Sequence, residues 1–388
     1  MIISFLIQQK LYIFIINYKE GTKMKKVICV FMLSLLAVNL MAADGWYKGW
    51  GYRQKLTIDY NSVSTNLVDF PILITETNIA AGLFTNALAN GDDILFTAND
   101  GTTKLSHEIE SYDAVNETMA AWIKIPALSA TANTDIYVYY DNSAAANQED
   151  ITNVWANGYV GVWHLSEQSG LSMDSSFNSN NATTNGVVDM AAPGKIGGAD
   201  SFAGAGHINV PANEADLGMN TNSFTVSVWY KKTVPTGSDM IIAGESNGGM
   251  SAYRGFSLYV TGTGLYDWFG DAVLSRRQIS TGDGAGTWHR ASSVWNKGDA
   301  TVQLYRDGLL KGTTAGSGHT VTGTQIDIGA ANGGAQFNGS IDEVRISLTA
   351  RNAGWLATEY NNQNDPVSFA ASSGEEMFTP AGTVIMVR

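Results

Sequence analysis

The sequence predicts an all-β protein made of two consecutive β-sandwich domains, and three observations support this. Short apolar runs alternate with polar residues, clusters of Gly, Asn, Asp and Ser separate the runs, and in the second half they recur about every ten residues. Gly is abundant at 41 and Pro scarce at 7 among 388 residues. A chain of this length is expected to form two or three domains.

The first predicted β-rich domain covers residues 46–147. In the run at 55–60, Leu56, Ile58 and Tyr60 fall on one side of a strand, because successive side chains alternate between faces. Asn-Asp-Gly at 99–101 favours a hairpin turn. The small, polar stretch at 142–150 indicates a linker or domain edge. The remaining predicted strands are 70–74, 93–97, 120–126 and 135–142.

The second predicted domain covers residues 154–370. A short helix is expected at 350–362, docking through Trp355, Leu356 and Tyr360. Residues 371–388 are expected to be a loosely held C-terminal tail, although 383–387 could add an edge strand. The predicted strands, besides the opening stretch, are 224–229, 255–260, 288–295, 301–308 and 324–330.

The N-terminus indicates export. Residues 24–43 carry two lysines, an apolar stretch and small closing residues, which together are typical of a secretory signal peptide. A membrane anchor is the alternative, but the apolar stretch is short for a bilayer span of about 20 residues. Residues 1–23 are interpreted as a mis-called start, with an extended n-region of the signal or a second apolar segment as the alternative. We expect no membrane span after cleavage, and a periplasmic, secreted or cell-surface location.

The charge and cysteine content of the chain limit the kinds of partner that it is expected to bind and the ways in which it can be stabilised. The formal net charge of −13 makes nucleic acid and anionic membrane poor partners, and suits solubility or divalent cations. The single cysteine, Cys29, lies inside the expected signal, so no disulfide would stabilise the exported chain. Stability would have to come from large cores or bound ions.

Two stretches of the chain resemble known families. "VWHLSE", "SFAGAGHINVP", "NSFTVSVWYK", "LYRDGLLKG" and "FNGSIDEVRIS" resemble the laminin-G-like, concanavalin-A-like jelly-roll family across residues 154–369. "GWGYRQKLTI", "GDDILFTANDGTTKLSHEIESYD" and "IYVYYDN" look like DUF2341, a domain of unknown function. The first resemblance implies a jelly roll that binds glycans or proteins, frequently with calcium. Neither resemblance implies an established reaction, and fold alone does not fix function.

The sequence offers no assured catalytic residue. Glu-x-Asp-x-x-Glu, one acid pattern of concanavalin-like hydrolases, is absent, and so are nucleophile motifs. Glu108 and Glu110 would share one strand face and could act as acid and base, but an exposed acidic edge is the favoured interpretation. His164 and His289 each follow a Trp and are interpreted as sheet or core residues.

Asp342 raises the question of a metal. Strict alternation in "GSIDEVRIS" places Asp342 on one face with Val344 and Ile346, where a carboxylate needs a charged or hydrogen-bonding partner. The oxygen-rich loop at 174–181 could supply Asp174, and Ca²⁺ prefers such ligands. We therefore consider Asp174 and Asp342 as calcium ligands. Acceptance of backbone N–H groups, or a pair with Arg351, is the alternative for Asp342.

A ligand site is considered on residues 264–278. Tyr266 and Trp268 are aromatic platforms close to Arg276, a combination that suits a glycan. The alternative is that these aromatic side chains pack into the sandwich core.

The sequence thus favours an exported, non-catalytic binding protein that recognises an extracellular polysaccharide or a cell-surface glycoprotein. A polysaccharide hydrolase or lyase with acids still to be located is the enzymatic alternative. An envelope or adhesin component that binds protein is the structural one.

Overall fold

The computed structural model describes residues 12–20, 23–31, 45–233, 238–245, 255–261, 264–270, 275–278, 285–315, 325–331 and 334–379. Side chains are not described in 12–31, 238–240, 245, 268–270 and 275–278. The chain divides into two units, and Gly45–Thr379 forms the larger. In the smaller unit, β1 (Tyr12–Glu20) pairs antiparallel with β2 (Lys23–Phe31). No helix among the described residues is long and apolar enough to cross a membrane.

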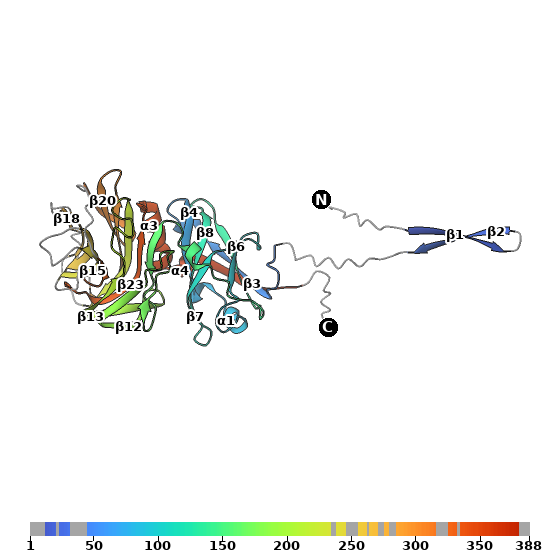
Figure 1. Ribbon diagram of the computed structural model, residues 1–388, viewed down its shortest axis with the longest axis horizontal. Coiled ribbons are helices and arrows are strands. Elements are labelled where there is room, and N and C mark those ends of the chain that lie inside the picture. The colour runs from blue at the N-terminus through green and yellow to red at the C-terminus, as the bar shows by residue number, and fades with distance from the viewer. Residues whose placement is uncertain are drawn as a thin grey trace. The chain divides into compact units, whose positions relative to one another are not determined.

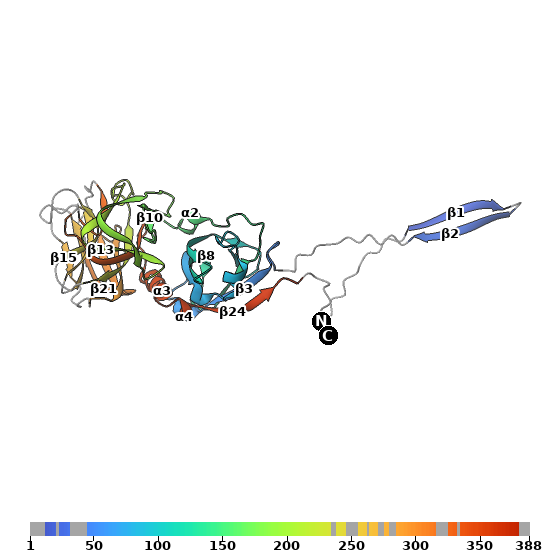
Figure 2. The same cartoon turned by 90° about the horizontal axis from the view of Figure 1, so that it is seen from below.

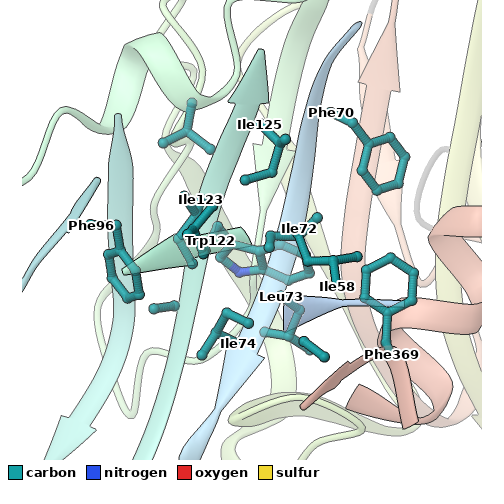
Figure 3. Packing of buried hydrophobic residues seen from close by; sticks show 14 of the residues in the cluster. Ile58, Phe70, Ile72, Leu73, Ile74, Phe96, Trp122, Ile123, Ile125 and Phe369 are labelled. Carbon is teal, nitrogen blue, oxygen red and sulfur yellow. The ribbon is translucent and has the colours of Figure 1, made fainter. Parts of the chain in front are cut away.

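The first β block consists of two antiparallel sheets. A five-stranded sheet has the order β24-β3-β9-β5-β6, in which β24 is Ala370–Met377, and a three-stranded sheet has the order β4-β8-β7. Their apolar side chains meet in one core, in which Figure 3 shows Ile58, Ile72, Trp122 and Ile123 together. The elements are β3 (Tyr52–Ile58), η1 (Tyr60–Ser62), β4 (Leu67–Thr75), η2 (Glu76–Asn78), α1 (Gly82–Asn86), β5 (Leu95–Ala98), β6 (Lys104–Leu105), β7 (His107–Asp113), β8 (Thr118–Leu128), β9 (Thr134–Tyr140) and α2 (Ile151–Val154).

The second block is a strongly curled sheet with the main order β18-β17-β16-β15-β22-β13-β23-β14-β19-β20-β21. Strand β10 also pairs with β23, and β12 joins β11 to β13. The strands are β10 (Tyr159–Trp163), β11 (Leu171–Ser172), β12 (Ala182–Pro193), β13 (Gly198–Val210), β14 (Phe224–Lys232), β15 (Ser238–Glu245), β16 (Gly255–Thr261), β17 (Gly264–Gly270), β18 (Ser275–Gln278), β19 (Trp288–Asn296), β20 (Thr301–Arg306), β21 (Leu309–Ala315), β22 (Ile326–Ile328) and β23 (Asn338–Ser347).

The two blocks are joined by a shared hydrophobic core. Val162 of β10, Val294 of β19 and Tyr305 of β20 belong to the same buried cluster as the first block's core. A separate cluster fills the inside of the jelly roll. The sheets that carry both clusters confirm the all-β prediction.

Helix α3 (Ala353–Asn364) lies between the blocks, next to β4 on one side and β21 on the other (Figures 1 and 2). Asn352 caps its N-terminus by accepting a hydrogen bond from the Trp355 backbone N–H. Trp355 and Leu356 are buried and Tyr360 stacks on Trp229, so the predicted docking face is confirmed. The short helix α4 (Pro366–Phe369) follows directly.

The sequence interpretation of the C-terminus is wrong for residues 371–377. These residues form most of β24 (Ala370–Met377), which pairs antiparallel with β3 at the edge of the first block, as Figure 2 shows. Arg53 forms an ion pair with Glu376 at 2.7 Å, and Gln54 donates to the Ser373 carbonyl at 2.9 Å. The chain therefore returns to its first domain after completing the second. The possible strand at 383–387 lies outside the described residues.

Ending the chain at Phe369 should destabilise the large unit, because β3 would become an unprotected edge strand. With about 1 kcal/mol net for each lost ladder hydrogen bond, we expect unfolding to become easier by 2 kcal/mol or more. Urea denaturation measures this against a chain ending at Thr379, which keeps β24. Equal midpoints for the two chains would contradict a stabilising role for β24.

Candidate functional site

A β-bulge in β23 decides which side chains face the first block. Strand β14 pairs Ser227 with Arg345 and Trp229 with Asp342. The one residue between Ser227 and Trp229 therefore lies opposite two residues of β23, Glu343 and Val344. Glu343, one of these two, has a left-handed φ of 53°. A bulge of this kind interrupts the two-residue alternation of a strand.

Because of this bulge, the prediction of the sheet face on which Asp342 lies is wrong. Ile341, Val344 and Ile346 all pack in the jelly-roll core. Asp342 and Glu343 point away from that core, because the extra residue shifts the alternation between Ile341 and Val344. Strict alternation had placed Asp342 with Val344 and Ile346.

A second bulge brings two acids of the first block to the same place. In β7 the register with β8 shifts between Ile109 and Ser111, which leaves Glu110 as the extra residue. The side chains of Glu108 and Glu110 are 7% and 1% exposed. The favoured sequence interpretation of an exposed acidic edge is therefore wrong.

His164 lies among three glutamates from distant segments. Its Nδ1 is 2.7 Å from a Glu343 oxygen and 3.5 Å from a Glu110 oxygen, and its Nε2 is 3.2 Å from Glu108. Trp122 donates its indole N–H to Glu110 at 2.9 Å. The imidazole therefore bridges the first block and the jelly roll.

Arg345 continues the array of charges. Its guanidinium forms an ion pair with Glu343 through Nη2 and another with Glu359 of α3 at 3.2 Å. The same group stacks on the rings of Trp122 and Trp155, at 4.1 and 4.6 Å from their centroids. Such cation–π contacts are strongest where water is excluded.

Arg290 of β19 ends the array beneath α3. It pairs with Glu359 at 2.7 Å and donates to Gln363 Oε1 at 2.7 Å. Trp229 also donates its indole N–H to that oxygen, at 2.6 Å. Positive and negative side chains thus alternate from Glu108 to Arg290, and we call this set the buried charge array.

The protonation states of the acids and of His164 keep the positive and negative charges of the array in balance. His164 and Arg345 hold the pKa of Glu343 at about 2 despite its burial, whereas three glutamates raise the pKa of His164 well above its usual value. Burial, followed by the charge of Glu343, raises the pKa of Glu110 to about 8. At neutral pH Glu110 is therefore mostly a neutral acid beside ionised partners.

Glu110, His164 and Glu343 offer one ligand atom each within 4.8 Å of one another, the only such group of three among the described residues. Carboxylate and imidazole ligands suit zinc. A cation there would compete with the ion pair between Arg345 and Glu343 and with the proton on His164. The contacts therefore favour an internal electrostatic role over metal binding.

A cleft of about 770 Å³ opens between the two blocks beside the array. The first block contributes residues 75–77, 111–113 and 118–120, and the second contributes 190–193, 195–198 and 363–367, together with flanking residues. Gly197 separates the cleft from the array, since a Cβ there would lie 2.6 Å from Glu110 Oε1. No described donor reaches that oxygen.

Lys195 and Tyr112 both line the cleft, but the Tyr112 hydroxyl is buried, so of the two only Lys195 offers its polar group there. Lys195 Nζ donates to the Asn364 side chain at 3.2 Å and lies 5.1 Å from the ring centroid of Trp229. Tyr112 stacks on Phe84, and its hydroxyl has no partner among the described residues. Burial raises the pKa of Tyr112 to about 12, so the buried hydroxyl keeps its proton.

The two predicted metal ligands have protein partners. Asp342 Oδ2 accepts from the backbone N–H groups of Lys195 and Ile196 at 2.7 and 3.0 Å, as the alternative expected. Arg351, the other partner considered, donates to the Asn157 carbonyl.

Asp174 accepts four hydrogen bonds. The donors are the backbone N–H groups of Val162, Ser176 and Asn180 and the Ser176 hydroxyl, each at 2.9 Å. Calcium at Asp174 and Asp342 stays a prediction, and these donors argue against it.

The predicted aromatic ligand site is only partly described. Tyr266 is 5% exposed and stacks on Tyr259, as expected for a packing residue. The backbones of Trp268 and Arg276 are paired between β17 and β18, but their side chains lie outside the described residues. The ligand hypothesis for this site stays a prediction.

Replacing Glu110 with Gln should remove one source of pH-dependent instability. The unfolded glutamate ionises near 4.5, whereas the native one keeps its proton to about 8, so between these values the native state holds more protons. The free energy of unfolding then falls with rising pH, by roughly 1 kcal/mol per pH unit from this group. Gln keeps an acceptor for Trp122 and cannot ionise.

We therefore expect the Glu110→Gln protein to gain stability over the wild type as pH rises from 5 to 8. Urea midpoints of both proteins at several pH values give the difference in their stability. Taking this difference removes the contribution of His164, whose raised pKa also makes stability fall as pH rises. A difference that stays constant across this range would contradict a neutral buried Glu110.

Comparisons with known proteins identify two regions. Residues 202–357 match the laminin-G model described as the concanavalin A-like lectin/glucanases superfamily. Residues 90–178 match the model of DUF2341, a domain of unknown function. The search of curated proteins finds no match.

Several solved structures match part of this chain, with low structural similarity. Domain 4 of AbnA, a GH43 extracellular arabinanase from Geobacillus stearothermophilus in complex with arabinotriose, has 19% identity and a TM-score of 0.42, covering 51% of this chain and 96% of its own. The CBM40 of the Ruminococcus gnavus IT-sialidase, bound to α2,3 sialyllactose, has 15% identity and a TM-score of 0.37, covering 41% and 94%. Similarity at this level says nothing about the ligand of this chain.

The two family models occur in the order that the sequence resemblance predicted. The chain therefore contains a laminin-G-like, concanavalin A-like domain preceded by a domain of the DUF2341 type.

Proposed function

We propose that this protein is an exported, non-catalytic binding protein that recognises an extracellular glycan in the cleft between its two blocks. The observation that carries the proposal is the composition of the cleft, which combines Lys195 with side chains that carry hydroxyl, amide and carboxylate groups. Sugar hydroxyls both donate and accept hydrogen bonds, so a mixed lining of this kind suits them. A lectin-type family model over residues 202–357 is consistent with it.

The charge of the cleft favours a neutral glycan over an acidic one. Glu76, Asp113 and Asp365 line it together with the single basic residue Lys195 among its described lining. Hydrogen bonds from their own turns lower the pKa of Asp113 and of Asp365, so both stay ionised at neutral pH. A sialic acid or uronic acid carboxylate would meet net negative charge there.

A hydrolase or lyase is the second candidate. The pKa of Glu110 is raised and that of Glu343 lowered, and acids whose pKa values are driven apart are a feature of acid–base pairs in enzymes. However, the Glu343 side chain is fully buried and engaged by His164 and Arg345. Gly197 also stands between the cleft and Glu110, which keeps a glycosidic bond from reaching either acid.

Binding is tested on a glycan array that includes neutral and acidic polysaccharides. Lys195→Met removes the amine but keeps most of the length of the side chain, so we expect about tenfold weaker binding, the effect of roughly 1.4 kcal/mol from one hydrogen bond. Thermal stability should fall only slightly, because the two hydrogen bonds that the amine makes with Asn364 are exposed.

Trp268→Ala is the matched variant for the alternative site on β17 and β18. Weaker binding by Trp268→Ala, with Lys195→Met unaffected, would place the ligand there and not in the cleft. Binding only to proteins from an envelope extract would favour an adhesin. Release of reducing ends or unsaturated products from any arrayed polysaccharide, lost in Glu110→Gln, would show that the protein is an enzyme.

A further inference from the structure

The Glu110 carboxyl holds one oxygen against the wall of the cleft. Its side chain is 1% exposed, and Oε2 accepts from the Trp122 indole N–H at 2.9 Å and lies 3.5 Å from His164 Nδ1. The other oxygen, Oε1, lies beside Gly197, where a Cβ would be 2.6 Å away, and has no hydrogen-bond partner among the described residues. A neutral carboxyl tolerates such a position far better than a carboxylate, which needs donors at both oxygens.

Residues 194–197 form the turn between β12 and β13, which we call the cleft turn. The N–H of its first residue donates to the carbonyl of its last, Gly197, at 3.3 Å. The N–H groups of Lys195 and Ile196 both donate to a single carboxyl oxygen, Asp342 Oδ2. These two residues and Gly197 also line the cleft. The cleft turn therefore has the buried charge array on one side and the cleft on the other.

The cations of this part of the array already have carboxylate partners. His164 lies 2.7 Å from Glu343 and 3.2 Å from Glu108. Arg345 forms its ion pair with Glu343 as well. Burial, followed by the charge of Glu343, raises the pKa of Glu110 to about 8. An ionised Glu110 would therefore depend on water for the donors that Oε1 lacks.

Ionisation of Glu110 also weakens the hydrogen bonds between Asp342 and the cleft turn. Burial, followed by the charges of Glu343 and Glu110, raises the pKa of Asp342 well above its usual value. A charge on Glu110 therefore keeps Asp342 neutral, and a neutral carboxyl accepts hydrogen bonds more weakly than a carboxylate. Both effects of a charged Glu110 act on the same turn.

We propose that the cleft turn is a pH-sensitive switch, which lies closed over Glu110 while this side chain is neutral and opens towards the cleft when it ionises. Opening lets water from the cleft reach Oε1 and supply the missing donors. The same movement displaces Lys195, which lines the cleft. The switch goes beyond the proposed glycan recognition and does not depend on it, because it responds to protons alone.

Hydrogen–deuterium exchange of the full chain between pH 5 and pH 8 tests the switch, with each rate corrected for the intrinsic exchange rate at that pH. In the wild type the amides of Lys195 and Ile196 should lose protection by about tenfold or more as pH rises, because opening releases a proton from Glu110. Glu110→Gln keeps an acceptor for Trp122 and cannot ionise, so in this variant the protection should stay constant.

Two controls separate the switch from other effects. The amides of Ser176 and Asn180 donate to Asp174, away from the cleft turn, and should keep their protection in both proteins. Asp342→Asn retains an oxygen that accepts from the turn, and it should still lose protection with rising pH, since Glu110 is intact.

Constant protection of Lys195 and Ile196 in the wild type would overturn the proposal, and so would an undiminished loss in Glu110→Gln. An equal loss at Ser176 and Asn180 would show general loosening of the fold instead of a switch. A pH dependence that disappears in Asp342→Asn alone would assign the effect to that acid and also contradict the proposal.

If Glu110→Gln does not fold, the wild type still decides. Protection that falls up to about pH 8 and then levels off supports Glu110 as the titrating group, because the closed form ionises there by itself. Protection that keeps falling beyond that pH contradicts it. Each of these readouts is independent of any glycan.

Discussion

Arg345 lies between two carboxylates and two indole rings in the layer where the two β blocks meet. Its position connects the sheet of the jelly roll, helix α3 and the tryptophans of the first block. Moving a guanidinium out of water costs several kcal/mol, so it is stable there only while Glu343 and Glu359 stay in place. The fixed geometry of this ion pair therefore constrains how the blocks can dock.

The need to pair every buried charge also limits which side chains of the array can be ionised. Glu108, Glu343 and Glu359 are matched by His164, Arg345 and Arg290, and a negative charge on Glu110 would break this balance. Hydrophobic packing alone would tolerate small sliding of the two sheets. Alternating charges with paired hydrogen bonds do not, because each shift leaves a buried charge without a partner.

The cleft follows from this docking. Its walls come from both blocks, and the segment 195–198 that borders it is held to Asp342 by two backbone hydrogen bonds. Strand β24 adds a further link, because the chain returns to β3 after completing the jelly roll. A binding surface built between domains needs such rigid supports, since recognition groups must keep their spacing.

Much of the fold could be predicted from the sequence, whereas most of the site could not. Alternation and turn residues gave the strands, and family motifs indicated the jelly roll. The sequence drew attention to Glu108, Glu110 and Asp342, but it placed the first two on an exposed edge and Asp342 on the wrong face. His164 was interpreted as a core residue, and Lys195 gave no signal. Local periodicity determines which segments become strands, because it depends on neighbours in the chain. Only tertiary structure decided where the bulges at Glu110 and Glu343 fall, since a bulge is set by the partner strand, and these bulges decide which charges meet.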